Sequence, residues 1–220
     1  MKIICDMVMA GAASLAFTTA AQGTTVINIG LTNSQETLLV VPTLSNGITP
    51  RPASFGDATL VFNDALTALT YTINVFNIDF TGAQTADVND NLLAAHIHAG
   101  LNVTPTTNGP VVFGFFGAPL NENAADLAVT PFTNGVGGTI SGKWDAAEGN
   151  NTTLTAQLNN LLNGRAYLNF HTVQFGGGEI RGNFSSAVPE PATWAMMMLG
   201  FGMVGYGLRR RPLPAPPLLA

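Results

Sequence analysis

A regular alternation of apolar and polar residues between positions 66 and 80 constrains the fold of this chain more than any other feature. Leu69, Tyr71 and Ile73 alternate with threonine, which is the period of two expected when one face of a β-sheet is buried. Glycine and asparagine separate this run from further strand candidates at 58–64, 109–116, 138–144, 166–173 and 178–184. We therefore expect an all-β domain over residues 24–186, folded as an antiparallel β-sandwich or a Greek-key barrel.

One segment of this domain has the period of a helix instead. Its leucines are spaced at i, i+4, i+7 and i+8, and a glycine follows them, as is common just past the end of a helix. We expect one short amphipathic helix before the last hairpin, formed by Leu154, Leu158, Leu161 and Leu162 and closed by Gly164.

The first 21 residues have the pattern of a secretory signal peptide. Lys2 precedes an apolar run that extends through Phe17, and small residues suited to cleavage follow at 19–21. A buried N-terminal helix is the alternative interpretation. Cys5, the single cysteine of the chain, lies in this leader, so the fold must be stabilised without disulfides.

The C-terminal region combines a proline motif, an apolar segment and a basic cluster. Residues 192–208 are 17 uncharged, mostly apolar residues, marginal for a membrane-spanning helix, which needs about 20. Basic residues after such a segment stay cytoplasmic, which places the preceding domain outside. A plain tail anchor is one interpretation of this order. The order also resembles the PEP-CTERM sorting signal of Gram-negative bacteria over residues 188–211, through Pro189, Glu190, Pro191, Arg209, Arg210 and Arg211.

The PEP-CTERM resemblance implies a processing partner and a destination. It implies recognition by an exosortase-type transpeptidase and cleavage near Pro189 to Pro191, after transient anchoring of the hydrophobic helix in the inner membrane. Delivery to the cell surface or an extracellular polysaccharide matrix would follow. The short proline-rich tail at 212–220 departs from the signal, which normally stops soon after its arginines.

Charge is scarce and excludes one class of partner. Charged residues make up 10% of the chain, against about 25% in ordinary soluble domains. The residues between the two terminal segments carry 11 acidic side chains and four basic ones, Arg51, Lys143, Arg165 and Arg181. Nucleic-acid binding needs a clustered basic face, so we expect no nucleic-acid partner. An uncharged, threonine-rich surface suits an exopolysaccharide or another surface protein.

All three histidines of the chain lie in two short segments. His96 and His98 are two residues apart, so in a strand they point to the same face. If the strand of His171 is a neighbour, the three imidazoles form a site suited to zinc or copper. The alternative is a hydrogen-bonded network of neutral imidazoles, oriented by Asn169 or Glu179. Because Ile97 and its neighbours make the more apolar face, we expect the histidines on the less buried, more accessible face.

The order of these blocks resembles the CHRD (chordin-like) domain over about residues 56–184. The resemblance implies a β-sandwich-like extracellular module, of the kind found in chordin. Its most specific part is the last block, formed here by Gly164, Tyr167, His171, Thr172, Gly178, Glu179, Ile180, Arg181 and Gly182.

Two functions from different classes follow from these patterns. One is a non-enzymatic surface module without a cofactor, which binds a protein or an exopolysaccharide. The other is an extracellular copper or zinc enzyme built on the three histidines, with no other catalytic residues indicated. Three weaker patterns remain. Glu179 and Arg181 can pair with each other or with another strand. Asp87, Asn89 and Asp90 offer oxygen ligands for calcium, and Trp144 is the aromatic residue that we expect to be exposed.

Overall fold

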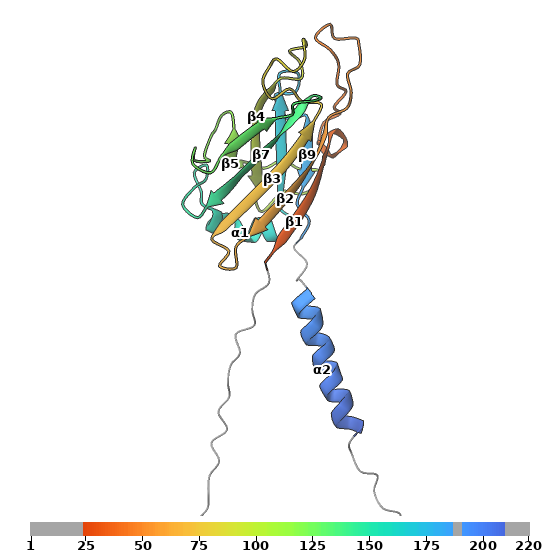
Figure 1. The fold of residues 1–220 in the computed structure, drawn as a ribbon, viewed down its shortest axis with the longest axis vertical. Helices are drawn as coiled ribbons and strands as arrows, with labels where there is room; N and C mark the ends of the chain where they lie inside the picture. Colours follow the sequence, from red (N-terminus) through yellow and green to blue (C-terminus); the bar gives the residue numbers. More distant parts are fainter. Residues whose placement is uncertain (1–23, 187–190, 210–220) are drawn as a thin grey trace, which may run out of the picture.

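The computed structural model describes residues 24–186 and 191–209, and its first part is an antiparallel sheet of nine strands (Figure 1). The predicted signal peptide at 1–21, Pro189, Glu190, Arg210, Arg211 and the tail at 212–220 lie outside the described residues. The strand order is β5-β4-β8-β9-β1-β2-β3-β7-β6. The strands are β1 (Val26–Thr32), β2 (Phe55–Phe62), β3 (Ala68–Phe76), β4 (Leu92–Ala99), β5 (Val111–Phe116), β6 (Ala128–Pro131), β7 (Gly137–Asp145), β8 (Ala166–Thr172) and β9 (Ile180–Asn183).

The alternating residues form the strands that the sequence predicts, and the all-β fold is confirmed. Strand β3 pairs with β2 and β7 over its whole length. Its buried residues, Leu69, Tyr71, Ile73 and Val75, face one side, and Thr70 and Thr72 face solvent on the other. Each large apolar side chain removed from water in this way stabilises the fold by about 1.5–3 kcal/mol.

The nine strands curl around the core as a half-barrel and do not form the two separate sheets of a sandwich. Aromatic rings from the two ends of the strand order meet inside the curl. Trp144 on β7 stacks on Phe113 of β5, with 4.6 Å between ring centroids, and Tyr71 on β3 lies 5.3 Å from Phe115. Trp144 is fully buried, and its indole N–H donates to the carbonyl of Glu148. The expectation that Trp144 is exposed is therefore wrong, because its ring fills the space between β7 and β5.

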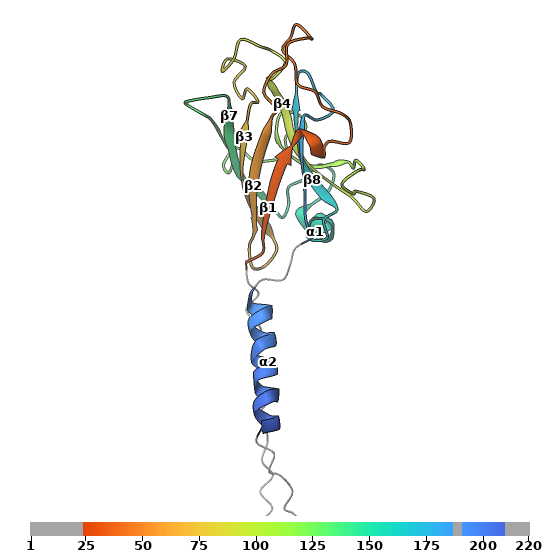
Figure 2. The ribbon, with the colours of Figure 1, turned by 90° about the vertical axis from the view of Figure 1, so that its right-hand side faces the viewer.

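The predicted helix is present as α1 (Leu154–Leu162), and it packs beside the sheet near β8 (Figure 2). Thr153 caps its N-terminus by accepting a hydrogen bond from the backbone N–H of Ala156 at 3.3 Å. Gly164 follows its end at a φ of 71°, a backbone conformation that favours glycine. Leu154 and Leu161 are buried in the core.

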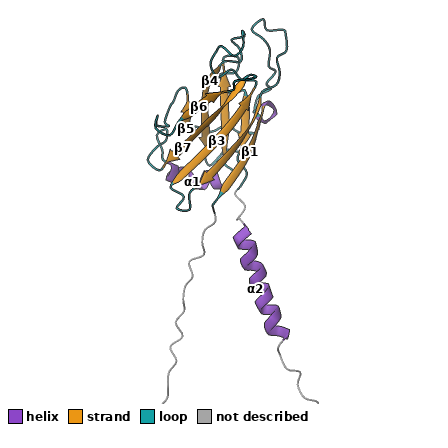
Figure 3. Ribbon diagram, in the orientation of Figure 1, coloured by secondary structure: helices purple, strands orange, loops and turns teal. Residues whose placement is uncertain are grey.

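A second helix, α2 (Pro191–Arg209), covers the apolar segment of the C-terminal region (Figure 3). In the part of the chain that the structure describes, neither helix combines the length and the hydropathy that crossing a bilayer requires. The predicted membrane-spanning character of this segment is therefore not confirmed.

Loops cover the outer face of β4, β8 and β9, so these strands are buried on both sides. Every residue of β8 is buried. The long connection between β1 and β2 is fixed over this face by Arg51, whose guanidinium forms a two-pronged ion pair with the carboxylate of Glu179. The connections between β4 and β5, between β5 and β6 and between β8 and β9 cover the rest. The outer side of β8 thus becomes an enclosed polar layer, and the three histidines lie in it.

Candidate metal centre

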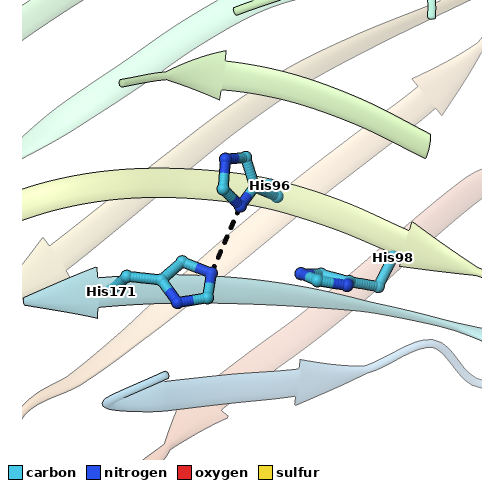
Figure 4. Close-up of side chains that lie close together, drawn as sticks. All are labelled: His96, His98 and His171. Carbon is cyan, nitrogen blue, oxygen red and sulfur yellow. Dashed lines mark hydrogen bonds between the residues drawn. The ribbon is translucent and has the colours of Figure 1, made fainter. Parts of the chain in front are cut away.

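Strand pairing brings the three histidines together. His96 and His98 project from β4 on the side that faces away from Ile97 and the core, and His171 projects from the adjacent strand β8 (Figure 4). His171 lies opposite Ala94 in the register, so its ring reaches diagonally toward His96. One nitrogen from each ring lies within 4.8 Å of the others, and His96 Nδ1 is 3.2 Å from His171 Nε2. The two strands that carry the histidines are neighbours, as a three-histidine site requires. Metal binding itself stays a prediction.

The histidines are far less accessible than expected. Only 5% of His96 and 9% each of His98 and His171 is exposed. The expected apolar face is correct for Ala95 and Ile97, which are in the core. Leu93 is half-exposed, because the register of β4 shifts between Leu92 and Ala94. Accessibility was mispredicted because the covering loops, and not the strand face, decide how much solvent reaches the rings.

Each imidazole contacts one backbone carbonyl from a covering loop. His96 Nε2 lies 3.1 Å from the carbonyl oxygen of Ala118, His98 Nδ1 lies 2.9 Å from that of Gly109, and His171 Nδ1 lies 3.1 Å from that of Gly176. A carbonyl oxygen only accepts hydrogen bonds, so each of these ring nitrogens carries the proton. In a neutral ring the other nitrogen then has a bare lone pair. The bare nitrogens are His96 Nδ1, His98 Nε2 and His171 Nε2, and they face one another.

The rings are neutral at physiological pH. Burial, and to a smaller extent the nearby His171, lower the pKa of His96 to about 4. Burial also lowers the pKa of His98 to about 4 and lowers the pKa of His171. No ring therefore carries the additional proton that a hydrogen bond between His96 Nδ1 and His171 Nε2 would need, and His98 Nε2 is buried without a hydrogen-bond partner. Three lone pairs meet with no donor between them.

This arrangement fits a metal ion. Zinc and copper bind the bare nitrogen of neutral imidazole, and zinc–nitrogen distances of about 2.0–2.1 Å place ligand nitrogens about 3.3 Å apart in a tetrahedral site. His96 Nδ1 and His171 Nε2, 3.2 Å apart, already have that spacing, and the nitrogen of His98 lies within 4.8 Å of them. In known metal sites the second nitrogen of each histidine commonly donates to a carbonyl or carboxylate, which fixes the ring and its tautomer. The carbonyls of Gly109, Ala118 and Gly176 take that role here.

Tyr167 and Arg181 extend the site along the sheet. The ring of Tyr167 on β8 stacks on His98. The guanidinium carbon of Arg181 on β9 lies 3.5 Å from the centroid of the Tyr167 ring. The backbone N–H of Gly109 donates to the Tyr167 hydroxyl at 3.3 Å. A Cβ at Gly109 would lie 2.3 Å from the Val103 side chain, so only glycine fits where the loop approaches Tyr167 and His98.

Glu179 and Arg181 do not pair with each other, and neither they nor Asn169 orients a histidine. Glu179 accepts hydrogen bonds from Arg51, Ser54 and Thr172 in a fully buried network. Arg181 is also fully buried, and its guanidinium donates only to neutral acceptors: Asn183 Oδ1, Asn108 Oδ1 and the carbonyls of Thr104 and Thr107. The proposed orienting role fails because the loop carbonyls already accept the N–H group of each imidazole.

The remaining motif residues support the fold around the site. Ile180 is in the core, Thr172 donates to Glu179, and a Cβ at Gly182 would clash with Ile29. Gly178 has a φ of 128°, and a Cβ there would lie 2.5 Å from Asn169 Oδ1.

The loop that carries the candidate calcium ligands Asp87, Asn89 and Asp90 is hydrogen-bonded to the rest of the domain. Asn89 donates to the carbonyl of Thr43, Asp87 accepts from the backbone N–H of Ser45, and Asp90 accepts from Thr85. Within the described residues, Asp87 and Asp90 do not join a cluster of metal-ligating groups. These contacts position the loop between β1 and β2.

No sequence pattern indicates the carbonyl groups of Gly109, Ala118 and Gly176, or Arg51 as the partner of Glu179. Backbone acceptors leave no side-chain signal. Arg51 and Glu179 are 128 residues apart, so no local pattern connects them.

Comparisons with known families cover both parts of the chain. The model of the CHRD domain matches residues 28–184, and that of the PEP-CTERM protein-sorting motif matches residues 187–211. No curated protein and no solved structure matches the chain.

Proposed function

Because this chain belongs to the CHRD domain family and carries a PEP-CTERM protein-sorting motif, we propose that it is a surface-sorted module that binds one copper or zinc ion. The sorting motif implies export and sorting to the surface of a Gram-negative bacterium by an exosortase-type system. The metal ligands in this proposal are His96, His98 and His171.

The observation that supports metal binding is the convergence of three bare nitrogens. Backbone carbonyls fix the protonated side of each ring, and burial keeps the rings neutral. A purely structural network would require a donor between His96 and His171 and a partner for His98 Nε2. A cation satisfies all three lone pairs at once.

The residues of the chain hold the ligands in place and exclude water. The loop carbonyls fix the ring orientations, and Tyr167 covers one face of His98. A bound zinc or copper ion would supply Lewis acidity, and copper would also supply one-electron redox chemistry. An enzymatic role would need substrate access that the present burial of the rings restricts.

Metal content tests this proposal. The full chain, exported to the periplasm and purified without a histidine tag, is offered copper and zinc in turn, dialysed and analysed by mass spectrometry for metals. We expect about one equivalent in the wild type and in Thr72→Ala, a control on the solvent face, and none in folded His98→Ala. Failure of the wild type to retain either metal would overturn the proposal.

The sorting route is tested separately. In this proposal α2 holds the precursor at the inner membrane until an exosortase-type enzyme cleaves near Pro189 to Pro191. In a Gram-negative host with such a system, replacing Pro189 and Pro191 with alanine should retain a full-length, cell-bound precursor. A deletion of residues 212–220 serves as the control for the tail. Normal release of the double variant would contradict the route.

A second candidate function is contact with a neutral exopolysaccharide. Its basis is a register-matched row of uncharged hydrogen-bonding residues across the solvent face of four strands: Asn28, Thr59, Thr72 and Ser141. Affinity electrophoresis in gels that contain a neutral glucan would measure the contact. We expect Thr72→Lys to reduce retardation, and Ala65→Lys, in the turn between β2 and β3, to leave it unchanged. Equal retardation of Thr72→Lys and wild type would exclude this face.

A further inference from the structure

Among the residues that the structure describes, no acidic side chain hydrogen-bonds to any of the three imidazoles. All three protonated nitrogens face neutral carbonyl oxygens. Of the groups that commonly take this outer position in metal sites, a carboxylate offsets part of the charge of the ion and a carbonyl does not. Here a bound ion would keep its full charge.

A positively charged residue, Arg181, lies beside the site along the sheet. Arg181 stacks on Tyr167, whose ring stacks on His98. The side-chain acceptors of Arg181 are uncharged. Glu179 is the acidic residue nearest to Arg181 in the sequence, but its charge is already neutralised by the ion pair with Arg51.

Glu36 is the carboxyl group that acts on Arg181, and it offsets this charge only in part. Burial raises the pKa of Glu36 to about 7, although Arg181 opposes the shift. Glu36 therefore holds its proton more strongly than an ordinary glutamate does. The surroundings of the three nitrogens thus have a net positive bias.

These charges discriminate between ions by valence. The cost of burying an ion rises with the square of its charge, and the repulsion from Arg181 rises in proportion to it. A divalent ion with three neutral ligands would remain an uncompensated double charge in a buried layer. A monovalent ion that accepts three nitrogen ligands meets a much smaller penalty.

We propose that the three-histidine site is selective for copper(I) over copper(II) and zinc(II). This inference rests on the metal site of the proposed function and adds the oxidation state of its ion. It requires no redox step within the protein, because copper(I) is bound as such.

Competition titrations of the full-length protein test the selectivity. Copper(I) is titrated without oxygen against bicinchoninate, and copper(II) and zinc(II) are titrated against chelators of known affinity. We expect copper(I) to bind at least about 100-fold more tightly than zinc(II). Tighter binding of copper(I) than of copper(II) also raises the reduction potential of the bound ion, by about 59 mV for each tenfold ratio.

A variant that adds a carboxylate tests the cause. Asn169 lies on β8 between Tyr167 and His171, on their face of the strand and opposite His96. Asn169→Asp should reduce the preference for copper(I) over zinc(II) by about tenfold or more and lower the potential. Thr72→Asp adds the same charge on the solvent face and should change neither the preference for copper(I) nor the reduction potential. If Asn169→Asp does not fold, Glu36→Gln removes the partial compensation and should strengthen the preference for copper(I).

The outcomes separate the two proposals. Binding of none of the three ions would overturn the metal-binding function and this inference with it. Binding of zinc(II) or copper(II) as tight as that of copper(I) would leave the metal site standing and overturn the selectivity. If Asn169→Asp and Glu36→Gln both left the ratio of the copper(I) to the zinc(II) affinity unchanged, the selectivity would not arise from charge. That result would also overturn the inference.

Discussion

The imidazole of His98 lies parallel to the ring of Tyr167, with 4.6 Å between the centroids and 6° between the planes. The two residues are register partners on β4 and β8. The stack fixes the rotation of the His98 ring, and the hydrogen bond to the carbonyl of Gly109 fixes which nitrogen faces His96 and His171. One cross-strand pair thus determines the direction of a candidate ligand.

Loss of the Tyr167 ring should weaken metal binding. Tyr167→Leu removes the surface on which His98 stacks, and we expect the affinity for copper or zinc to fall by about 10-fold or more, as for other outer partners of metal ligands. Tyr167→Phe keeps the ring and should stay within about threefold of the wild type. Competition titration measures both. Equal losses in the two variants would assign the effect to the hydroxyl and contradict the stacking role.

The buried pair of Arg51 and Glu179 should dominate the stability of the loop between β1 and β2. Glu179→Gln leaves the guanidinium of Arg51 buried without a counter-charge, and we expect a loss of about 3–5 kcal/mol in the free energy of unfolding. Lys143→Ala removes a solvent-exposed ion pair with Asp126 and should cost less than about 1 kcal/mol. Urea denaturation compares the two. A similar small loss in both variants would show that the loop is held by its other contacts.

The fold was predictable wherever one sheet face is buried and the other meets solvent. The alternation around Ile73 gave β3 correctly, and the leucine spacing gave α1. The short edge strand β6 (Ala128–Pro131) and the first strand were not predicted. The choice between sandwich and half-barrel was beyond local patterns, because it depends on Phe113 and Trp144 meeting across the interior.

The ligand set of the candidate site was predictable, and its environment was not. Same-face spacing in a strand is a local property, so His96 and His98 were correctly placed together. Burial and tautomer are set by loops that return to the site from elsewhere, through the carbonyls of Gly109, Ala118 and Gly176. A carbonyl is present in every residue, so no residue type indicates which ones will contact a ring.

Glu36 should make the stability of the protein fall as pH rises. Its pKa is raised from 4.5 to about 7 in the native state, so between these pH values the native state keeps a proton that the unfolded chain has released. Glu36→Gln lacks this titration. We expect the variant to gain about 1–3 kcal/mol relative to the wild type between pH 4.5 and 7.5, as measured by urea denaturation. A difference that is constant over this range would contradict the raised pKa.

The histidines should have the opposite effect and make the metal-free protein less stable in acid. The native pKa values of His96 and His98 are about 4, against 6.5 for the free side chain. Below pH 6.5 the unfolded chain takes up protons that the native rings refuse, so stability is lost as pH falls from 6.5 to about 4. Bound metal should delay this loss, because the ion occupies the nitrogens that the protons need.

The histidine effect is isolated by comparing unfolding free energies of wild type and His98→Gln in the presence of a chelator. Glu36 acts in the same pH range with the opposite sign, but it is present in both proteins and largely cancels in the difference. We expect the stability advantage of the wild type over His98→Gln to shrink by at least about 1 kcal/mol between pH 6.5 and 4.5. An advantage that stays constant would mean that His98 takes up its proton as readily in the native protein as in the unfolded chain. The bare Nε2 would then be open to protons and solvent, and the geometric argument for a metal ion at this nitrogen would lose its basis.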